Sequence, residues 1–344
     1  MTGYARNSPN HAASPGGTIS VKATALWFAT ISLGLCLFGC DEKPGAAAGS
    51  PPPSTGAPSA AKTVEIAAKY PAPKRLVAFG DVHGDLDATK RALRLAGAID
   101  ASDAWIGGDL VVVQTGDDID RGDEDRAILD LFDRLRDEAK AKGGMFLVLN
   151  GNHELMNAAL DFRYVTDGAK KTFDDLATDK RAGVPSVAEP DRGRANAFFP
   201  GGVYAKRLAE RPIIAIVGDS VFVHGGVLLK HLDYGVDKMD GEVKRWLRGE
   251  APLPDVVMAE DGPVWTRNYS AQPSKKECDE LDKVLDRLGA KRMVMGHTPQ
   301  KPDINAACGD KAWRIDTGMS KYYAGNVEVL EIAGDAVKVL KESP

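Results

Sequence analysis

The sequence contains few histidines and few cysteines, six and four among 344 residues, so each one can be followed along the chain. It also lacks an excess of basic charge, because 44 Lys and Arg residues stand against 49 Asp and Glu residues, giving a net charge of -5. Nucleic-acid-binding domains are typically basic, so we expect no nucleic acid among the partners. The apolar share of 43% and the charged share of 27% are near the globular average, which excludes wholesale disorder and a polytopic membrane protein.

One uncharged, apolar segment stands near the N-terminus, at residues 23–39. At about seventeen residues it is short for a membrane-spanning helix and is typical of the hydrophobic region of a signal peptide. The segment leads directly into Cys40, and the string from Leu37 to Cys40 resembles a bacterial lipobox, in which the leader is cut before a cysteine that becomes lipidated. The alternative is an uncleaved anchor helix, and both interpretations tether the chain to a membrane.

The sequence therefore predicts three regions. Residues 1–39 are a lipoprotein-type signal peptide, and residues 40–62 comprise the lipidated Cys40 and a linker rich in Pro, Gly, Ala and Ser, which is typical of a flexible spacer. Residues 63–344 form the folded domain. This organisation predicts a membrane-anchored lipoprotein of the bacterial cell envelope that faces the periplasm, with the membrane as a partner through the N-terminal lipid.

In the first half of the domain, three short apolar runs each stop at a loop that contains Gly and charged or amide side chains. The runs are residues 75–79, 110–114 and 145–149, and the first two are followed by helical spacing of apolar residues. This strand, loop and helix order is typical of an α/β domain, which places its sites just beyond the carboxyl ends of its strands.

The second half adds antiparallel strands. Turn signals at Gly218-Asp219 and Gly334-Asp335 separate apolar runs and predict two hairpins. Two further runs, residues 220–223 and 292–295, lead into His224 and His297. We expect two mixed β-sheets that pack face to face, with helices outside.

Four of the six histidines lie in such loops at strand ends, namely His83, His153, His224 and His297. His11 belongs to the leader, and His231 stands alone in a polar stretch, where we expect an ordinary surface residue. The four loop histidines are interleaved along the chain with Asp81, Asp117 and Asn152. Imidazole, carboxylate and amide oxygen are ligands for Mn, Fe or Zn, whereas the absence of a thiolate cluster argues against an iron-sulfur or structural zinc site.

The strings GDVHG, GDDIDRG, GNHE, HGG and GHTP resemble the five ordered motifs of the metallophosphoesterases of the phosphoprotein phosphatase superfamily. Within that superfamily the sequence is most similar to the Shewanella-like protein phosphatases, as FRYVTDGA, VWTRNYS, MVMGHTPQ and AWRIDTGMS further indicate. The similarity spans residues 75–332. It implies an α/β (α+β) calcineurin-like metallophosphoesterase fold, in which two mixed β-sheets are sandwiched between helices.

The resemblance also implies a role for each motif residue. Two divalent ions, Mn first and Fe or Zn as alternatives, would be held by Asp81, His83 and Asp117 on one side and by Asn152, His224 and His297 on the other, with Asp117 bridging both. A metal-bridging hydroxide would attack phosphorus in line. His153 would protonate the leaving oxygen while Asp120 orients its ring. Arg121 would bind the phosphate, and Arg267 would be a second phosphate clamp or else a surface or structural arginine.

The predicted activity is hydrolysis of a phosphomonoester, and the resemblance favours phosphotyrosine in proteins. A phosphodiesterase or a dinucleoside polyphosphate hydrolase on the same fold, and a binding protein that has lost catalysis, are the alternatives. The strings GNHE and GHTP favour monoester hydrolysis over a diesterase, which commonly reads GNHD and Gly-His-x-His. The substrate is then a phosphorylated protein or a small phosphomonoester.

Three features stay open at the level of sequence. Asp118 stands where relatives often carry an uncharged residue, and is either a solvated loop acid or a group that repels acidic substrates. Residues 161–200 form part of the substrate wall or a surface insertion. Cys278 and Cys308 are either joined by a disulfide, which an oxidising compartment permits, or are two free buried thiols.

Overall fold

The computed structural model describes residues 64, 66–178 and 181–342. The predicted signal peptide, Cys40 and the linker lie outside the described residues, so the three-region organisation stays a prediction. Within the described part of the chain, no helix is long and apolar enough to cross a membrane.

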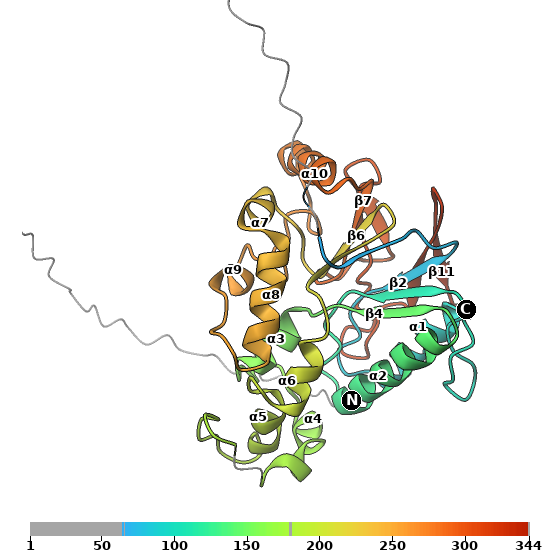
Figure 1. Cartoon of the computed structure of the whole chain (residues 1–344). Coiled ribbons are helices and arrows are strands. Elements are labelled where there is room, and N and C mark those ends of the chain that lie inside the picture. The colour runs from blue at the N-terminus through green and yellow to red at the C-terminus, as the bar shows by residue number, and fades with distance from the viewer. Residues whose placement is uncertain (1–63, 65, 179–180, 343–344) are drawn as a thin grey trace, which may run out of the picture. The chain divides into compact units, whose positions relative to one another are not determined.

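The described residues form eleven strands, ten α-helices and one 3-10 helix (Figure 1). The strands are β1 Lys69–Tyr70, β2 Leu76–Phe79, β3 Val111–Gln114, β4 Met145–Val148, β5 Ile214–Val217, β6 Ser220–Val223, β7 Arg292–Met295, β8 Asn305–Ala307, β9 Ala312–Arg314, β10 Glu328–Ala333 and β11 Ala336–Lys341. The helices are α1 Leu86–Leu95, α2 Asp125–Ala141, α3 Asn152–Ala158, α4 Asp167–Lys171, η1 Asp174–Leu176, α5 Arg192–Phe198, α6 Val203–Leu208, α7 Leu229–Tyr234, α8 Val236–Leu247, α9 Asp255–Met258 and α10 Lys275–Leu288.

The strands make two mixed sheets. One sheet has the order β11-β10-β2-β3-β4, in which β2, β3 and β4 run parallel and β10 pairs antiparallel with β2. The other has the order β1-β5-β6-β7-β9-β8, and its β5–β6 hairpin pairs Val217 with Ser220 across the predicted turn. The expectation of two mixed sheets is confirmed.

Alternating side chains on the strands separate three layers of core. Because neighbouring residues of a strand point to opposite faces, Ala78 and Val113 of one sheet meet Phe222 and Val294 of the other in the layer between the sheets. The opposite face of the first sheet packs against α1 and α2, and the opposite face of the second packs against α7, α8 and α10. The order of layers is thus helix, sheet, sheet, helix.

Local signals explain the helices that frame the sheets. The carboxylate of Asp85 accepts a hydrogen bond from the backbone N–H of Ala88, so α1 begins where a polar cap meets an apolar face. Ser274 caps α10 in the same way, and Gly289 ends that helix with a φ of 63°. Helix α10 is also joined to the β8–β9 hairpin by a disulfide between Cys278 and Cys308, the first of the two alternatives.

His231 does not lie on the surface, which corrects the expectation for this residue. Its ring is fully buried, its Nδ1 accepts a hydrogen bond from the backbone N–H of Leu228 at 3.0 Å, and its Nε2 lies 2.9 Å from the carbonyl oxygen of Asp261. The imidazole therefore caps the start of α7. The polar neighbours in sequence gave no sign of this, because the burial comes from tertiary packing.

Candidate active site

The predicted site residues meet at the carboxyl ends of strands from both sheets. Asp81 and His83 follow β2, Asp117 follows β3, Asn152 and His153 begin α3 after β4, His224 follows β6, and His297 follows β7. Each of these side chains is at least nine-tenths buried. The structure therefore brings together all six predicted metal ligands and the predicted proton donor.

The backbone approaches itself closely at this junction. A Cβ atom on Gly151 would lie 2.2 Å from Oδ1 of Asp117, so only glycine allows α3 to start there. His83, Asp117 and His297 adopt positive φ values of 43°, 59° and 69°, conformations that non-glycine residues adopt rarely. Such strain is typical of functional sites, where the surrounding structure holds side chains in one direction.

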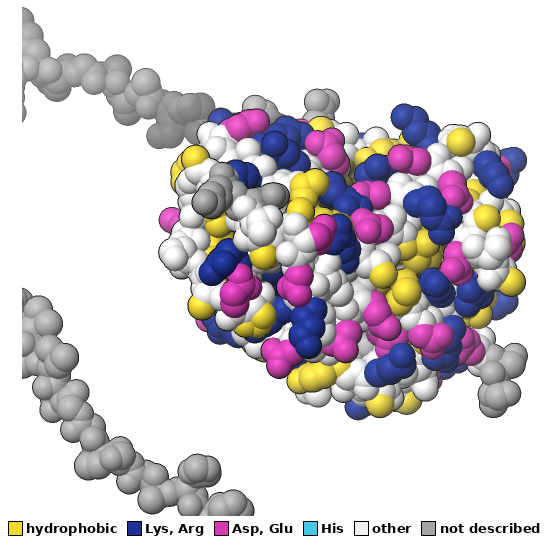
Figure 2. Space-filling model, turned by 90° about the horizontal axis from the view of Figure 1, so that it is seen from below, with side chains coloured by type: hydrophobic (Ala, Val, Ile, Leu, Met, Phe, Trp, Pro, Cys, Tyr) yellow, Lys and Arg dark blue, Asp and Glu magenta, His cyan; other side chains and the backbone are white. Residues whose placement is uncertain are grey.

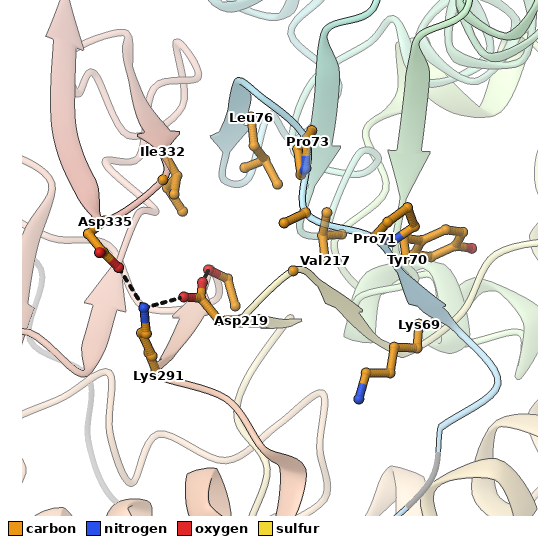
Figure 3. Close-up of a pocket in the computed structure, with 14 residues that line it drawn as sticks. Lys69, Tyr70, Pro71, Pro73, Leu76, Val217, Asp219, Lys291, Ile332 and Asp335 are labelled. Atoms are coloured by element: carbon orange, nitrogen blue, oxygen red, sulfur yellow. Dashed lines mark hydrogen bonds and ion pairs between the residues drawn. The ribbon is translucent and has the colours of Figure 1, made fainter.

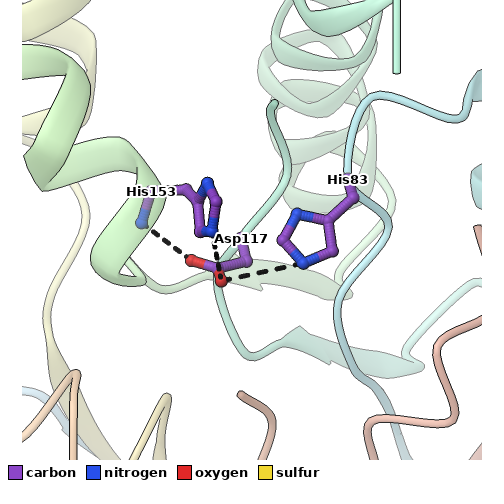
Figure 4. A group of neighbouring side chains, drawn as sticks. All are labelled: His83, Asp117 and His153. Carbon is purple, nitrogen blue, oxygen red and sulfur yellow. Dashed lines mark hydrogen bonds and ion pairs between the residues drawn. The ribbon is translucent and has the colours of Figure 1, made fainter. Parts of the chain in front are cut away.

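Asp117 occupies the centre of the group. Its Oδ2 atom lies 3.9 Å from Nε2 of both His83 and His153 (Figure 4). The same oxygen lies 3.1 Å from Nε2 of His224. Its Oδ1 atom accepts a hydrogen bond from the backbone N–H of His153 at 3.0 Å. One carboxylate is thus shared by two groups of potential ligands, His83–Asp117–His153 and Asp117–His224–His297, and the ligand atoms within each group lie within 4.8 Å of one another.

Each histidine is held through its outer nitrogen. Nδ1 of His83 lies 3.2 Å from the carbonyl oxygen of Ile119, Nδ1 of His224 lies 3.0 Å from that of Thr115, and Nε2 of His297 lies 2.9 Å from that of Trp265. A carbonyl oxygen accepts only, so these outer nitrogens carry the proton and the inner nitrogens present lone pairs. This is the arrangement by which proteins orient metal-binding histidines.

The inner atoms then face each other without a donor. Nε2 of His224 lies 2.9 Å from Oδ1 of Asn152, 3.1 Å from Nδ1 of His297 and 3.1 Å from Oδ2 of Asp117. Buried acceptors at such distances repel one another unless a cation lies among them. The donor set of nitrogen and oxygen atoms fits a divalent transition metal.

The pKa values fit the same role. Burial lowers the pKa of His83 to about 3 and that of His297 to about 2, so both rings are neutral, as metal ligands must be. Burial raises the pKa of Asp81 well above its usual range, and the nearby carboxylates of Asp316 and Asp117 raise it further. Several ionised carboxylates buried close together destabilise the fold unless a positive charge lies among them.

Asp81 lies beside the two groups of ligands. Its Oδ2 atom is 3.8 Å from Nε2 of His83, and both of its oxygens accept from the backbone N–H of His297 at 3.1 Å. It therefore connects a ligand loop of one sheet with a ligand loop of the other. The group His83–Asp117–His153 does not include Asp81, although Asp81 lies as near to Nε2 of His83 as Asp117 does.

His153 and Asp120 form a buried pair next to the centre. Nδ1 of His153 lies 2.6 Å from Oδ2 of Asp120, which leaves Nε2 directed toward Asp117. Burial opposes protonation of the ring, but the charges of Asp117 and Asp120 outweigh it and raise the pKa of His153. The pair can hold a proton at a fixed position beside the ligand groups.

Arg121 lies among aromatic rings at the mouth of the site. Its guanidinium carbon is 4.5 Å from the ring centre of Tyr164, 4.9 Å from that of Tyr322 and 5.3 Å from that of Tyr323. Its Nε atom is buried and has no hydrogen-bond partner among the described residues. Arg121 and Tyr322 also line a cleft of about 220 Å³ that reaches His83.

Arg267 is exposed, and its positive charge adds to the depression of the pKa of His297. It therefore lies at the edge of the second group of ligands rather than inside it. The three tyrosines around Arg121 were not predicted. The resemblance strings contained Tyr164 but gave it no role, and Tyr322 and Tyr323 lie in a loop whose path depends on the second sheet.

Further buried charges support the loops, and the sequence did not predict them. The carboxylate of Glu154 accepts from the backbone N–H groups of Asp117, Asp118 and Gly151 at 2.7–2.9 Å. Asp118 is fully buried and pairs with Arg211 at 2.5 Å, so it is neither a solvated loop acid nor a group that faces substrate. The charge of Asp118 therefore pairs with that of Arg211 inside the protein.

A second cavity, of about 490 Å³, lies at the opposite ends of the strands (Figure 3). Leu76, Val217 and Ile332 line it, and Lys291 crosses its edge to Asp219 at 3.1 Å and Asp335 at 2.5 Å. None of the predicted site residues lines it. The chemistry therefore concentrates at the carboxyl ends of the strands.

The fold and the shared-carboxylate site define a metal-dependent phosphoesterase. The sequence matches the calcineurin-like phosphoesterase family over residues 74–301, and the chain belongs to this family. The family implies divalent metal ions, and the two groups of ligands around Asp117 fit them.

Two relatives with protein phosphatase names narrow the class of phosphoesterase. The chain is 40% identical to Shewanella-like protein phosphatase 2 of Arabidopsis thaliana over 311 residues, covering 80% of each chain. It is 30% identical to Shewanella-like protein phosphatase 1 of Plasmodium berghei over 258 residues, covering 72% of this chain and 68% of the relative. The predicted resemblance is confirmed, and the protein is a metal-dependent phosphatase.

Among solved structures, the cold-active protein tyrosine phosphatase of a psychrophilic Shewanella species superposes with a TM-score of 0.66. The match covers 82% of this chain and 85% of that one, at 23% sequence identity. At this identity the similarity establishes the fold alone, which is the predicted calcineurin-like fold.

Proposed function

We propose that the protein hydrolyses phosphomonoesters with two bound divalent ions, Mn first and Fe or Zn as alternatives, and that it favours phosphotyrosine in proteins. The observation that carries this proposal is the position of the His153–Asp120 pair and of Arg121 beside two ligand groups that share Asp117. A proton donor and a phosphate-binding cation at one dinuclear site are what monoester hydrolysis requires.

Asp81, His83 and Asp117 would hold one ion, and Asn152, His224 and His297 would complete the other with Asp117. When bound, the ions would neutralise phosphate oxygens and activate a water molecule for attack on phosphorus. The outer hydrogen bonds to Ile119, Thr115 and Trp265 keep the inner histidine nitrogens free to bind them.

The side chains around the ions carry the remaining steps. Nε2 of His153 gives its proton to the leaving oxygen, and Asp120 fixes the ring by accepting from Nδ1. Arg121 binds phosphate oxygens through its planar fork, and Arg267 reaches the same anion from the exposed side. Arg121 lies in the loop between β3 and α2 and Arg267 in the loop between α9 and α10, so the two arginines would approach the phosphate from different segments of the chain.

The preference for phosphotyrosine is supported by the rings of Tyr164, Tyr322 and Tyr323 around Arg121. An aromatic leaving group can stack against them, whereas phosphoserine and phosphothreonine have no ring to stack. One neighbour by fold is named a protein tyrosine phosphatase, which agrees with this choice.

The test is a Mn-supplemented assay of the purified protein with matched phosphotyrosine, phosphoserine and phosphothreonine peptides. Bis(p-nitrophenyl) phosphate and a dinucleoside polyphosphate test the diesterase and polyphosphate activities. We expect the phosphotyrosine peptide to be hydrolysed fastest, and Asp117→Ala and His153→Ala to lose activity. Faster hydrolysis of the diester or polyphosphate would overturn the substrate class.

We also propose that the protein is a lipoprotein of the bacterial cell envelope, with residues 1–39 as its signal peptide and Cys40 as the lipidated residue. The uncharged segment before Cys40 supports this, and so does the Cys278–Cys308 disulfide, because disulfides persist in oxidising compartments. Labelling with radioactive palmitate tests it. We expect label in the parent protein and none in Cys40→Ser, and an unlabelled parent would reject lipidation.

A further inference from the structure

Arg194 lies on α5, within residues 161–200, the segment that the sequence left as a substrate wall or a surface insertion. Its side chain is fully buried. The guanidinium carbon lies 5.3 Å from the ring centre of Phe173 and 5.0 Å from that of Phe198. An arginine buried among aromatic rings is costly unless its charge is paired, so its partners indicate why it is there.

Those partners lead directly to His153. Nη2 of Arg194 lies 3.0 Å from Oδ1 of Asp120, and the other oxygen of that carboxylate lies 2.6 Å from Nδ1 of His153. Nε of Arg194 donates to Oδ1 of Asn157 at 2.7 Å. The amide nitrogen of Asn157 in turn donates to Oδ1 of Asp120 and to the carbonyl oxygen of His153, each at 2.9 Å.

A second carboxylate makes this cation necessary. Oδ2 of Asp125 lies 2.7 Å from Nη2 of Arg194, and Oδ1 of Asp125 accepts from the backbone N–H of Asp120 at 3.0 Å. Asp120 and Asp125 are both fully buried. Without Arg194 the two buried acids would face each other with no cation between them, and Oδ1 of Asp120 would be held by Asn157 without the arginine.

We propose that Arg194 is a positioning residue for the hydrolysis. It fixes Asp120, and through Asp120 and Asn157 it fixes the ring of His153 with Nε2 toward the centre. Helix α5 therefore serves the chemistry from inside the protein, while Tyr164 of the same segment lies at the mouth of the site. This inference rests on the proposed role of His153 as the proton donor to the leaving oxygen.

The role predicts a dependence on the leaving group that a purely structural residue would not produce. Phenolate is a poor leaving group and needs a proton as the bond to phosphorus breaks, whereas 2,4-dinitrophenolate leaves without one. General acid catalysis contributes about 10²–10⁴-fold, and this contribution applies only where the proton is needed. A displaced His153 ring should therefore lower the rate of phenyl phosphate hydrolysis far more than the rate of 2,4-dinitrophenyl phosphate hydrolysis.

The experiment compares Arg194→Lys and the charge-balanced Arg194→Met/Asp125→Asn variant with the parent protein in Mn. We expect kcat for phenyl phosphate to fall by about tenfold or more, kcat for 2,4-dinitrophenyl phosphate to change less than about threefold, and KM to stay within about twofold. Arg192→Met is the matched control, because Arg192 lies on the same helix but is half exposed and pairs with Glu189. It should behave as the parent does.

His153→Asn separates failure of the proposed function from failure of this inference. If His153→Asn slows both substrates equally, the role of His153 as proton donor is wrong. A second outcome would leave the role of His153 intact but overturn the role of Arg194. In that outcome His153→Asn slows the hydrolysis of phenyl phosphate selectively. The two Arg194 variants, whose melting curves show that they are folded, slow the hydrolysis of both substrates equally or of neither. We further expect Arg194→Lys to cause no additional loss in a His153→Asn background, since both act on one step.

If both Arg194 variants fail to fold, Asn157→Ala reports on the same chain of contacts. It removes the bonds from Asn157 to Asp120 and to His153 while leaving all charges paired. Selective loss with phenyl phosphate would support the positioning network, and equal rates with both substrates would overturn it.

Discussion

At the scale of single residues, the direction of each histidine depends on the atom behind it. Four rings from four different loops present a nitrogen to one centre because a backbone carbonyl or Asp120 binds the other nitrogen. His231, which caps α7, uses both ring nitrogens inside the fold, Nδ1 with the backbone N–H of Leu228 and Nε2 with the carbonyl oxygen of Asp261, so it presents none to a metal. Burial alone therefore does not make a histidine a metal ligand. A histidine can act as a ligand where its free ring nitrogen lies close to other electron-pair donors.

The tyrosines at the mouth of the site give a first prediction. We expect Tyr164→Ala and Tyr322→Ala each to lower kcat/KM for a phosphotyrosine peptide by about three- to tenfold, the size of an aromatic pair interaction. Hydrolysis of a matched phosphoserine peptide should change less than twofold. Steady-state kinetics with both peptides measure the ratio.

Tyr164→Phe is the control, because it keeps the ring and removes only the hydroxyl. It should retain the preference. An equal loss on both peptides in Tyr164→Ala would mean that the ring serves Arg121, whose guanidinium carbon lies 4.5 Å from the ring centre, and not the substrate.

His231 gives a prediction for stability against pH. Burial lowers its pKa to about 4 in the folded chain, although the carbonyl of Asp261 opposes the shift, while the unfolded value is about 6.5. Because the unfolded chain binds the proton more tightly, this residue costs no stability above pH 6.5 and destabilises the fold increasingly as pH falls from 6.5 toward 4. The loss is about 2–3 kcal/mol by pH 4.

Urea unfolding of the parent protein and of His231→Gln at several pH values measures this contribution as a difference. Glutamine does not titrate, so the gap in unfolding free energy between the two proteins should narrow by about 2–3 kcal/mol from pH 7 to pH 4. A gap that stays constant would show that His231 keeps its ordinary pKa in the fold.

At the scale of elements, sequence signals were sufficient where they are local. The helical spacing of apolar residues that follows the run at residues 75–79 becomes α1, Leu86–Leu95, because Asp85 caps this helix. The loops that follow β2, β3, β4, β6 and β7 were also predicted from the polar residues that end each apolar run. These are the loops that carry the ligands.

Elements that depend on distant contacts were not predicted. Helices α4, α5 and α6 are short and lack a long apolar period, and α5 is stabilised by burying Arg194 against carboxylates more than sixty residues earlier in the chain. Asp118 was judged against the uncharged residue that relatives often carry at its position, whereas its partner Arg211 lies in another segment of the chain. Paired buried charges carry no local pattern, so a single sequence does not reveal them.

The disulfide between α10 and the β8–β9 hairpin gives a prediction at this scale. Its two cysteines are 30 residues apart in sequence, and closing a loop of that length in the unfolded chain is worth about 3.6 kcal/mol. We expect the Cys278→Ala/Cys308→Ala double variant to melt several degrees lower than the parent protein while kcat stays within about twofold. Calorimetry and the phosphatase assay measure the two quantities.

Reduction of the parent protein with dithiothreitol should give the same lower melting temperature, and the double variant should not respond to it. A parent protein that melts at the same temperature with and without reductant, and that titrates as two free thiols, would show that the bond is not formed.

At the scale of the whole folded unit, the surface and the interior use charge differently. Lys and Arg side chains are interspersed with Asp and Glu on the face that Figure 2 shows, where exposed pairs contribute little to stability. The buried acids instead gather at the junction of the two sheets, where Asp81, Asp117 and Asp316 lie close together. The net negative charge of the chain is therefore partly an internal feature of the site.

We expect this arrangement to make bound divalent ions contribute to stability as well as to the proposed catalysis. One sheet supplies Asp81, His83, Asp117 and Asn152, and the other supplies His224 and His297, so bound ions would join the sheets at the carboxyl ends of their strands. We expect chelation with EDTA to abolish activity and to lower the unfolding free energy by about 3 kcal/mol, the stabilisation that a ligand supplies at a hundredfold excess over its Kd. Calorimetry with and without EDTA, followed by readdition of Mn, measures the change.

Asp117→Asn and Asp303→Asn are the matched variants for this prediction. Asp117 is the carboxylate that both ligand groups share, so its variant should melt at one temperature whether or not metal is present. Asp303 pairs with Lys341 at the surface, so its variant should lose stability on chelation as the parent does. If EDTA abolished activity but left the melting temperature of the parent unchanged, the two sheets would be held by their apolar layer alone, and the ions would serve only the chemistry.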